Sequence, residues 1–188
     1  MNKIDMTVGT VKMLKNYGHN SFKINNSESI KILEEALKKG VTKLDTAESY
    51  GKIEKIIPKS LLNCFEITSK INISEKNPIE QIETFFNKNK HVRKLLIHNA
   101  DIVFMNNHEE ILFKCSNYFK SKFGLSMYSP IYTEIAMENG IKNFQIPCNI
   151  LDNRWDFFKN KKTNVYVEAR SVFLQGILLK KNISLPKL

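Results

Sequence analysis

Arginine, cysteine, glycine and proline are scarce in this sequence, and each scarcity excludes a class of protein. Only 3 of the 29 basic residues are arginine, the side chain that forks onto phosphates and base edges. The formal net charge of +10 therefore predicts a solvated lysine surface rather than a nucleic-acid site. The three cysteines, far apart in the chain, fit neither a disulfide framework nor a zinc site, and we expect reduced, mostly buried thiols. Seven glycines and five prolines rule out a collagen-like or linker-dominated chain.

Long apolar runs and glycine-rich phosphate loops are also missing. No apolar stretch approaches the roughly 18 residues that a membrane span needs, and Met1–Met6 lacks the apolar part of a signal peptide. No G-x-G-x-x-G or P-loop motif follows an expected strand, which disfavours a dinucleotide-binding doubly wound sheet or a P-loop fold. We expect one soluble, cytoplasmic domain over residues 1–188 that binds neither nucleic acid nor membrane.

Short apolar runs alternate with capped helical stretches along the chain. Expected strands lie around 8–11 and at 41–44, 65–68, 94–97, 123–125, 144–147 and 165–167. Expected helices begin after Asn25, after Gly51, at Asn77-Pro78, after Asn107 and at Ser129-Pro130, the first ending at Gly40 and the second breaking near Pro58. Seven such units without a long linker predict a parallel sheet with helices outside it, either an open sheet or a barrel.

Polar side chains stand where the expected strands end. Asp45 ends the second strand and Tyr50 follows it, while Lys70 and His98 end the third and fourth. Taken singly, these residues are more typical of a helix cap, surface packing, one lysine among many and a core histidine. Parallel strands bring their carboxyl ends to one face, where the four would form a proton-donating site. An ammonium beside a phenol is expected to lower the phenol pKa, and an imidazole can hydrogen-bond a substrate oxygen.

The segments that hold these residues resemble a known family. Gly40–Gly51 is similar to the signature of the aldo-keto reductases around their catalytic Asp and Tyr, Thr68–Lys70 to their lysine strand, and Leu95–His98 to their histidine strand. The resemblance implies a catalytic tetrad, with Tyr50 as general acid and no metal. The tetrad residues are Asp45, Tyr50, Lys70 and His98.

The resemblance also implies a nicotinamide cofactor, with NADP(H) expected in preference to NAD(H). In the family a Ser and a Gln hold the nicotinamide carboxamide, and the loop after the seventh strand lies along the pyrophosphate. The implied cofactor-binding residues are Gly9, Thr10, Asp45, Ser126, Gln145, Arg170, Ser171, Leu174, Gln175 and Gly176. Met127 replaces a frequent Asn, and Arg170 stands where many members stack an aromatic ring on the nicotinamide. The segments Ser126–Pro130 and Asn149–Arg154 are similar to a bacterial branch in which such changes are ordinary.

The implied fold is an α/β, (β/α)8 TIM-type barrel, which typically needs about 250 residues. Against that length, the 188 residues predict a barrel shortened after its seventh strand, without the eighth strand and last helices. The first and seventh strands would then have unpaired edges, which could join copies into a homo-oligomer.

The implied function is reduction of a small carbonyl compound (an aldehyde, a ketone or a sugar-derived carbonyl) to an alcohol by hydride transfer. A catalytically weak or inactive relative that acts as a binding or structural protein is the first alternative, since a weakened grip on the cofactor would cost binding energy that positions the reacting groups. A polyanion-binding protein is the second.

Overall fold

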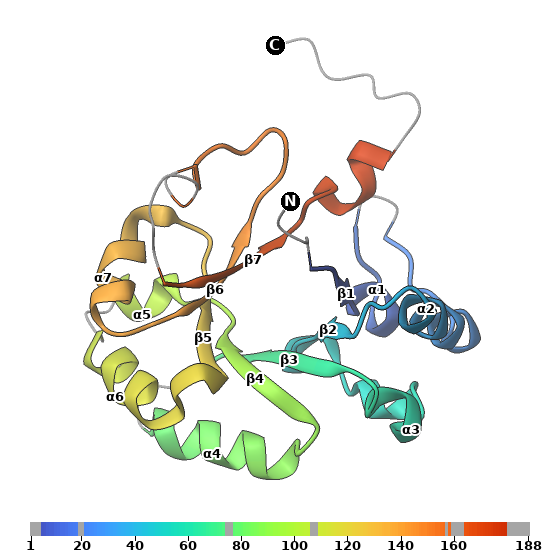
Figure 1. Cartoon of the computed structure of the whole chain (residues 1–188), viewed down its shortest axis with the longest axis horizontal. Helices are drawn as coiled ribbons and strands as arrows, with labels where there is room; N and C mark the ends of the chain where they lie inside the picture. The colour runs from blue at the N-terminus through green and yellow to red at the C-terminus, as the bar shows by residue number, and fades with distance from the viewer. Residues whose placement is uncertain are drawn as a thin grey trace.

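A parallel sheet of seven strands forms the centre of the computed structural model (Figure 1). The structure describes residues 5–18, 21–73, 77–105, 109–156, 158 and 164–179. The strands, hydrogen-bonded in chain order, are β1 Thr7–Gly9, β2 Lys43–Asp45, β3 Glu66–Ile71, β4 Val92–Ile97, β5 Phe123–Ser126, β6 Asn143–Pro147 and β7 Tyr166–Arg170. Each predicted strand is present, and β3 and β7 extend farther toward their carboxyl ends than the apolar runs indicated.

The sheet curls strongly, as contacts between distant strands demonstrate. Gln145 Nε2 on β6 lies 2.8 Å from Asp45 Oδ1 on β2, and Lys43 Nζ on β2 lies 3.5 Å from the Tyr166 hydroxyl on β7. In a flat sheet, strands four positions apart would be roughly 20 Å from each other. Within the described residues, β1 and β7 are not paired with each other. The structure therefore confirms an α/β fold of the TIM-barrel type through its seventh strand, as a curled half-barrel.

Helices cover the outer side of this sheet (Figure 1). They are α1 Val11–Leu14, α2 Asn26–Lys38, α3 Lys59–Leu62, α4 Pro78–Lys88, α5 Asp101–Met105, α6 Glu109–Phe119 and α7 Thr133–Glu138. Short 3-10 turns lie at η1 Glu48–Tyr50, η2 Ile53–Lys55, η3 Lys120–Lys122, η4 Pro130–Tyr132 and η5 Leu174–Leu179. Among the described helices, none is long and apolar enough to cross a membrane.

Local sequence signals explain where the longer helices begin and end. The Asn25 side chain accepts a hydrogen bond of 2.8 Å from the Glu28 amide at the start of α2, and Gly40 follows that helix with φ +77°, which glycine adopts without steric cost. α4 has Pro78 in its first turn, where the missing amide proton is not needed.

Two helical segments differ in detail from the sequence expectation. After Gly51 the chain forms the 3-10 turn η2 and then the short α3, with the expected break near Pro58, which removes a donor and restricts the residue before it. The sequence patterns also gave no indication of α5.

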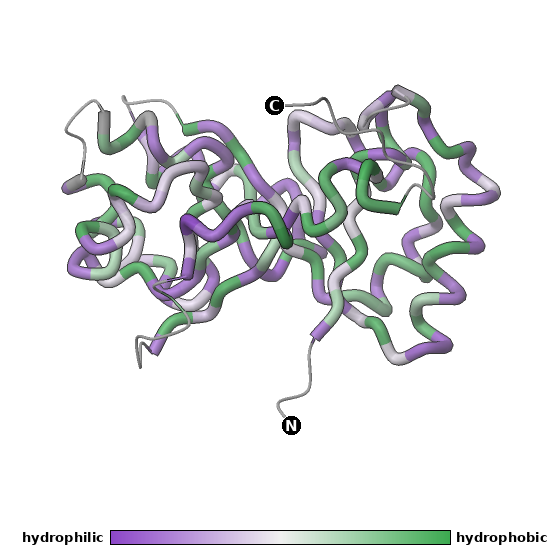
Figure 2. Tube along the Cα trace, turned by 90° about the horizontal axis from the view of Figure 1, so that it is seen from above, coloured by the Kyte–Doolittle hydropathy of each residue, from purple (hydrophilic) through white to green (hydrophobic). Residues whose placement is uncertain are grey.

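The core lies between the sheet and its helices. Leu44, Ile67, Leu95 and Leu125, on four successive strands, are fully buried, as expected for a parallel sheet covered on its outer face. The helices on the outside alternate between hydrophobic and hydrophilic residues along the tube in Figure 2, which is the pattern of a helix with one buried face.

The three thiols are not buried alike. Cys115 is buried, Cys148 is half-buried and Cys64 is exposed. The expectation of mostly buried thiols is therefore wrong for Cys64.

Candidate active site

The carboxyl ends of β2, β3 and β4 bring the four predicted tetrad residues into one cluster. Lys70 Nζ, on a side chain that is 1% exposed, donates a 2.5 Å hydrogen bond to Asp45 Oδ1. The same Nζ lies 5.6 Å from the centroid of the Tyr50 ring. The Tyr50 and His98 ring centroids are 5.8 Å apart, with the rings nearly perpendicular. A carboxylate, an ammonium, a phenol and an imidazole therefore meet as the sequence predicted.

Asp45 is the hub of this cluster. Its Oδ1 accepts from Gln145 Nε2 as well as from Lys70. Its backbone oxygen accepts two 3.0 Å hydrogen bonds, from the Thr10 amide and the Thr10 hydroxyl. These bonds hold the carboxylate in place, and the carboxylate compensates the charge of a buried ammonium, which would otherwise be costly.

The pKa of Tyr50 is raised above its ordinary value of 10, so the expected shift of the phenol pKa toward neutrality is wrong. The largest cause is burial, which disfavours the charged phenolate, and the charge of Asp45 adds to it. The charge of Arg170 acts in the opposite direction. The phenol is therefore protonated at neutral pH and available as a proton donor.

His98 is held in place directly after β4. Its amide donates a 2.8 Å hydrogen bond to the Ile71 carbonyl oxygen. Burial, followed by the charges of Lys70 and Arg170, lowers its pKa to about 4, so the imidazole is neutral at pH 7. Its Nδ1 lies 3.3 Å from the Ser49 hydroxyl oxygen; with that hydroxyl as donor, the ring proton lies on Nε2.

Ser49 is a contact that sequence reasoning missed. It stands directly before Tyr50, so its position within the tetrad segment was the available signal. Only the fold shows that its hydroxyl meets the His98 ring, 49 residues farther along the chain.

Two buried polar atoms next to the tetrad lack a partner. Ser126 and Gln145 are paired in register across β5 and β6 and are at most 1% exposed. The Ser126 Oγ and the Gln145 Oε1 form no hydrogen bond within the described structure, an arrangement that is costly unless a ligand completes it. A carboxamide has one acceptor oxygen and an NH2 donor, so the residues present fit the nicotinamide carboxamide.

The predicted residues on β1 lie beside Asp45. Gly9 ends β1, and a Cβ built there would have no heavy atom within 4 Å, which leaves space for a ligand above it. Thr10 is fully buried, and both of its donors are used on the Asp45 backbone oxygen. Thr10 therefore positions Asp45 in this structure.

The predicted residues after β7 form a turn with unusual backbone angles. Positive φ angles occur at Ser171 (59°), Leu174 (46°), Gln175 (56°) and Gly176 (95°), and such angles in residues other than glycine are strained. A Cβ on Gly18 would lie 2.9 Å from the Gln175 carbonyl oxygen. The turn thus packs against the chain after α1, at the opposite edge of the sheet (Figure 1).

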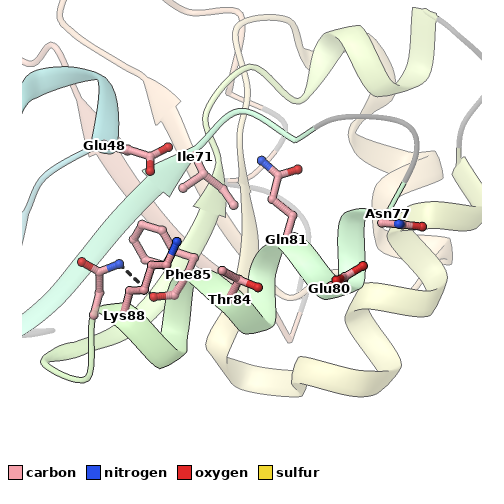
Figure 3. A pocket seen from close by; sticks show the side chains of 9 residues that line it. Glu48, Ile71, Asn77, Glu80, Gln81, Thr84, Phe85 and Lys88 are labelled. Carbon is pink, nitrogen blue, oxygen red and sulfur yellow. Dashed lines mark hydrogen bonds between the residues drawn. The ribbon is translucent and has the colours of Figure 1, made fainter.

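A cavity of about 420 Å³ lies outside the tetrad (Figure 3). Its lining residues are Glu48, Ile71, Asn77, Glu80, Gln81, Thr84, Phe85, Lys88 and Asn89. Glu48 faces it from η1, and most of the other residues belong to α4 or flank it. No tetrad residue lines this cavity.

The structure thus places a carboxylate, an ammonium, a protonated phenol and a neutral imidazole together at the carboxyl end of a parallel α/β half-barrel. A sequence profile described as the Aldo/keto reductase family matches residues 5–185. The chain belongs to this family of oxidoreductases.

Two solved structures, both from Pseudomonas aeruginosa and both assigned as aldo-keto reductases, resemble the chain. One is 17% identical with a TM-score of 0.61, and the match covers 86% of this chain and 71% of that one. The other is 16% identical with a TM-score of 0.57, and the match covers 86% and 70%. At these identities the likeness is one of fold. No curated protein matches the chain at a significant level.

Proposed function

We propose that this protein reduces a small carbonyl compound to an alcohol with a nicotinamide dinucleotide, with Tyr50 as the general acid. The observation that supports this proposal most directly is the Asp45–Lys70 pair of 2.5 Å beside a half-buried, protonated phenol. The preference for NADP(H) over NAD(H) rests on the family resemblance alone.

Each tetrad residue has its own role in the proposed proton transfer. A nicotinamide dinucleotide bound at this site would supply a hydride to the carbonyl carbon. As that carbon gains the hydride, the oxygen becomes negative, and the Tyr50 hydroxyl transfers its proton to it. The neutral His98, with its proton on Nε2, donates a hydrogen bond to the same oxygen.

The Tyr50 phenolate left by this step needs stabilisation and reprotonation. The Lys70 ammonium, 5.6 Å from the ring centroid, lowers the energy of that anion, and solvent returns the proton. Asp45 keeps Lys70 in place, which makes it a positioning residue in this scheme as well as a proposed cofactor contact.

The proposed cofactor contacts begin with Ser126 and Gln145. The Ser126 hydroxyl would donate to the carboxamide oxygen, and Gln145 Oε1 would accept from its NH2 group. Gln145 is oriented for this role because its own NH2 group donates to Asp45. The proposal extends to the surrounding residues Gly9, Thr10, Arg170, Ser171, Leu174, Gln175 and Gly176.

The test combines a binding titration with turnover. NADPH and NADH are titrated by quenching of the single tryptophan, Trp155, and a panel of small aldehydes is then offered with the better cofactor. Tyr50→Phe is expected to lower turnover by about 100-fold or more, in line with loss of a general acid, while cofactor affinity stays within about 2-fold of the wild type. Tyr118→Phe is the matched control, because this hydroxyl lies on the surface and bonds to Glu83.

Three outcomes distinguish the proposed reductase from the non-catalytic alternatives. An active Tyr50→Phe variant would refute Tyr50 as the acid. Saturable cofactor binding without turnover of any carbonyl would favour the non-catalytic binding protein. No saturable binding at millimolar cofactor would overturn the proposed function.

A further inference from the structure

Two basic side chains stand beside the proposed active site without a role in the proton transfer. Lys15 follows α1, is exposed, and places its Nζ 5.2 Å from the centroid of the Tyr50 ring. Arg170 ends β7 and places its guanidinium carbon 4.2 Å from the centroid of the Tyr128 ring. The two cations therefore come from opposite edges of the curled sheet, one after β1 and one at the end of β7.

Within the described part of the chain, neither cation forms an ion pair with a carboxylate. Other basic residues form ion pairs, as Lys70 does with Asp45 and Arg154 with Asp152. Among the described residues, no carboxylate lies within ion-pair distance of Lys15 or Arg170. In the hydrogen bonds of the described residues, the Arg170 side chain donates to the Met127 carbonyl oxygen at 3.3 Å, and its buried Nε has no partner among them.

Both charges act on the groups that would face the substrate. The charges of Arg170 and Lys15 each contribute to the low pKa of His98, and that of Arg170 also reaches Tyr50. The catalytic groups themselves carry little net charge, since His98 is neutral, Tyr50 is protonated and Lys70 is paired with Asp45. The electrostatic potential beside the phenol and the imidazole is consequently positive, which favours an anion over a neutral molecule there.

We propose that Lys15 and Arg170 bind an anionic group of the substrate, so that the enzyme reduces carbonyl compounds that carry a carboxylate. This inference rests on the proposed function and names its substrate class, and it assigns Arg170 to the substrate rather than to the cofactor. The carboxylate would lie between the two edges of the sheet, with the guanidinium of Arg170 and the exposed ammonium of Lys15 as donors. The carbonyl group of the same molecule would then extend toward Tyr50 and His98.

The experiment measures binding independently of turnover. The probes are 4-(hydroxymethyl)benzoate and its methyl ester, the alcohol products of a matched acid and ester pair, which do not react with lysine as aldehydes would. Dissociation constants are measured by ligand-observed NMR for the wild type, Lys15→Gln, Arg170→Gln and the control Lys122→Gln, which changes an exposed lysine next to the amino end of β5.

The acid is expected to bind about 10-fold or more tightly than the ester at low salt. This advantage should fall to about 3-fold or less in Lys15→Gln and at 0.5 M salt, and it should be unchanged in Lys122→Gln. Lys15 is exposed, so its variant is expected to fold even if Arg170→Gln does not, and thermal unfolding followed by circular dichroism checks both.

The outcomes separate this inference from the function on which it rests. Equal affinity for acid and ester in the wild type overturns it. It is also overturned if Lys15→Gln leaves the acid advantage intact and instead weakens NADPH binding, because the charge would then serve the cofactor phosphates. Tighter binding of glycerol 3-phosphate over glycerol, without an acid advantage, overturns the carboxylate assignment in favour of a phosphate. If the proposed function fails, because NADPH and NADH do not bind or no carbonyl of the panel is turned over, the affinity ratio of acid to ester can still be measured, so the two failures are distinguishable.

Discussion

Replacing Lys70 by Met tests the buried ion pair on which the site is built. Lys70 is 1% exposed, and Asp45, its partner at 2.5 Å, is 16% exposed. Met keeps most of the volume and removes the charge, so Asp45 would retain only the Gln145 hydrogen bond to its side chain. The variant therefore leaves a largely buried carboxylate without its counter-ion.

The expected cost follows from the distance and the burial. At 2.5 Å and an effective dielectric constant near 20, the attraction between the charges is about 7 kcal/mol. Desolvation offsets several kcal/mol of it, and removal of one partner from a buried pair typically costs about 3–5 kcal/mol. Because Asp45 keeps some solvent contact, we expect about 3 kcal/mol for Lys70→Met. The double variant Asp45→Asn/Lys70→Met should be less destabilised by about 1–2 kcal/mol, since no unpaired charge remains.

Urea unfolding monitored by Trp155 fluorescence and far-ultraviolet circular dichroism measures these differences. Lys43→Met is the control, because Lys43 pairs with Asp5 at a similar 2.6 Å while the side chains are 28% and 59% exposed. That exposed pair should contribute about 1 kcal/mol or less. The reasoning is refuted if Lys70→Met costs no more than Lys43→Met, or if the Asp45 and Lys70 changes prove additive.

Two further predictions address His98 and the packing of β5. Because burial lowers the pKa of His98 from 6.5 to about 4, the unfolded chain takes up the proton first as the pH falls. The His98 contribution to stability is thus complete above about pH 6.5 and is lost toward pH 4, and His98→Gln should flatten this part of the urea-midpoint profile; parallel profiles would contradict the assignment. Gly124→Ala should destabilise the protein by about 1–3 kcal/mol, because its Cβ would overlap the Asn143 backbone. Gly9→Ala, which meets nothing within 4 Å, should change the thermal midpoint little, and equal shifts for both would refute the packing argument.

The parallel sheet and the convergence of the four tetrad side chains could be predicted from the sequence because their signals are local, whereas the choice of a barrel over an open sheet came from the family resemblance. A strand in a covered parallel sheet is an uninterrupted apolar run, and parallel strands necessarily bring their carboxyl ends to one face. Asp45, Lys70 and His98 each follow or end such a run, so their convergence followed from the order of the elements. The cap at Asn25 and the end at Gly40 were predicted for the same reason, since a cap involves only a few neighbouring residues.

Lys15 and Ser49 could not be selected in this way. Lys15 is one of many lysines, and nothing nearby in the sequence distinguishes it. Its place against the Tyr50 ring depends on how the chain after β1 folds over the sheet. Ser49 stood within the tetrad segment, but its contact with His98 joins residues 49 positions apart.

The sequence by itself determined the fold class and which chemical groups stand at the carboxyl ends of the strands. Only the tertiary structure decided how those groups ionise and what they contact. Proximity to Lys70 predicted a lowered pKa for Tyr50, yet burial and the charge of Asp45 raise it. The physical reason is that a pKa depends on desolvation and on distances to charges from other strands. Those quantities exist only once the sheet has curled and brought β2 against β6 and β7.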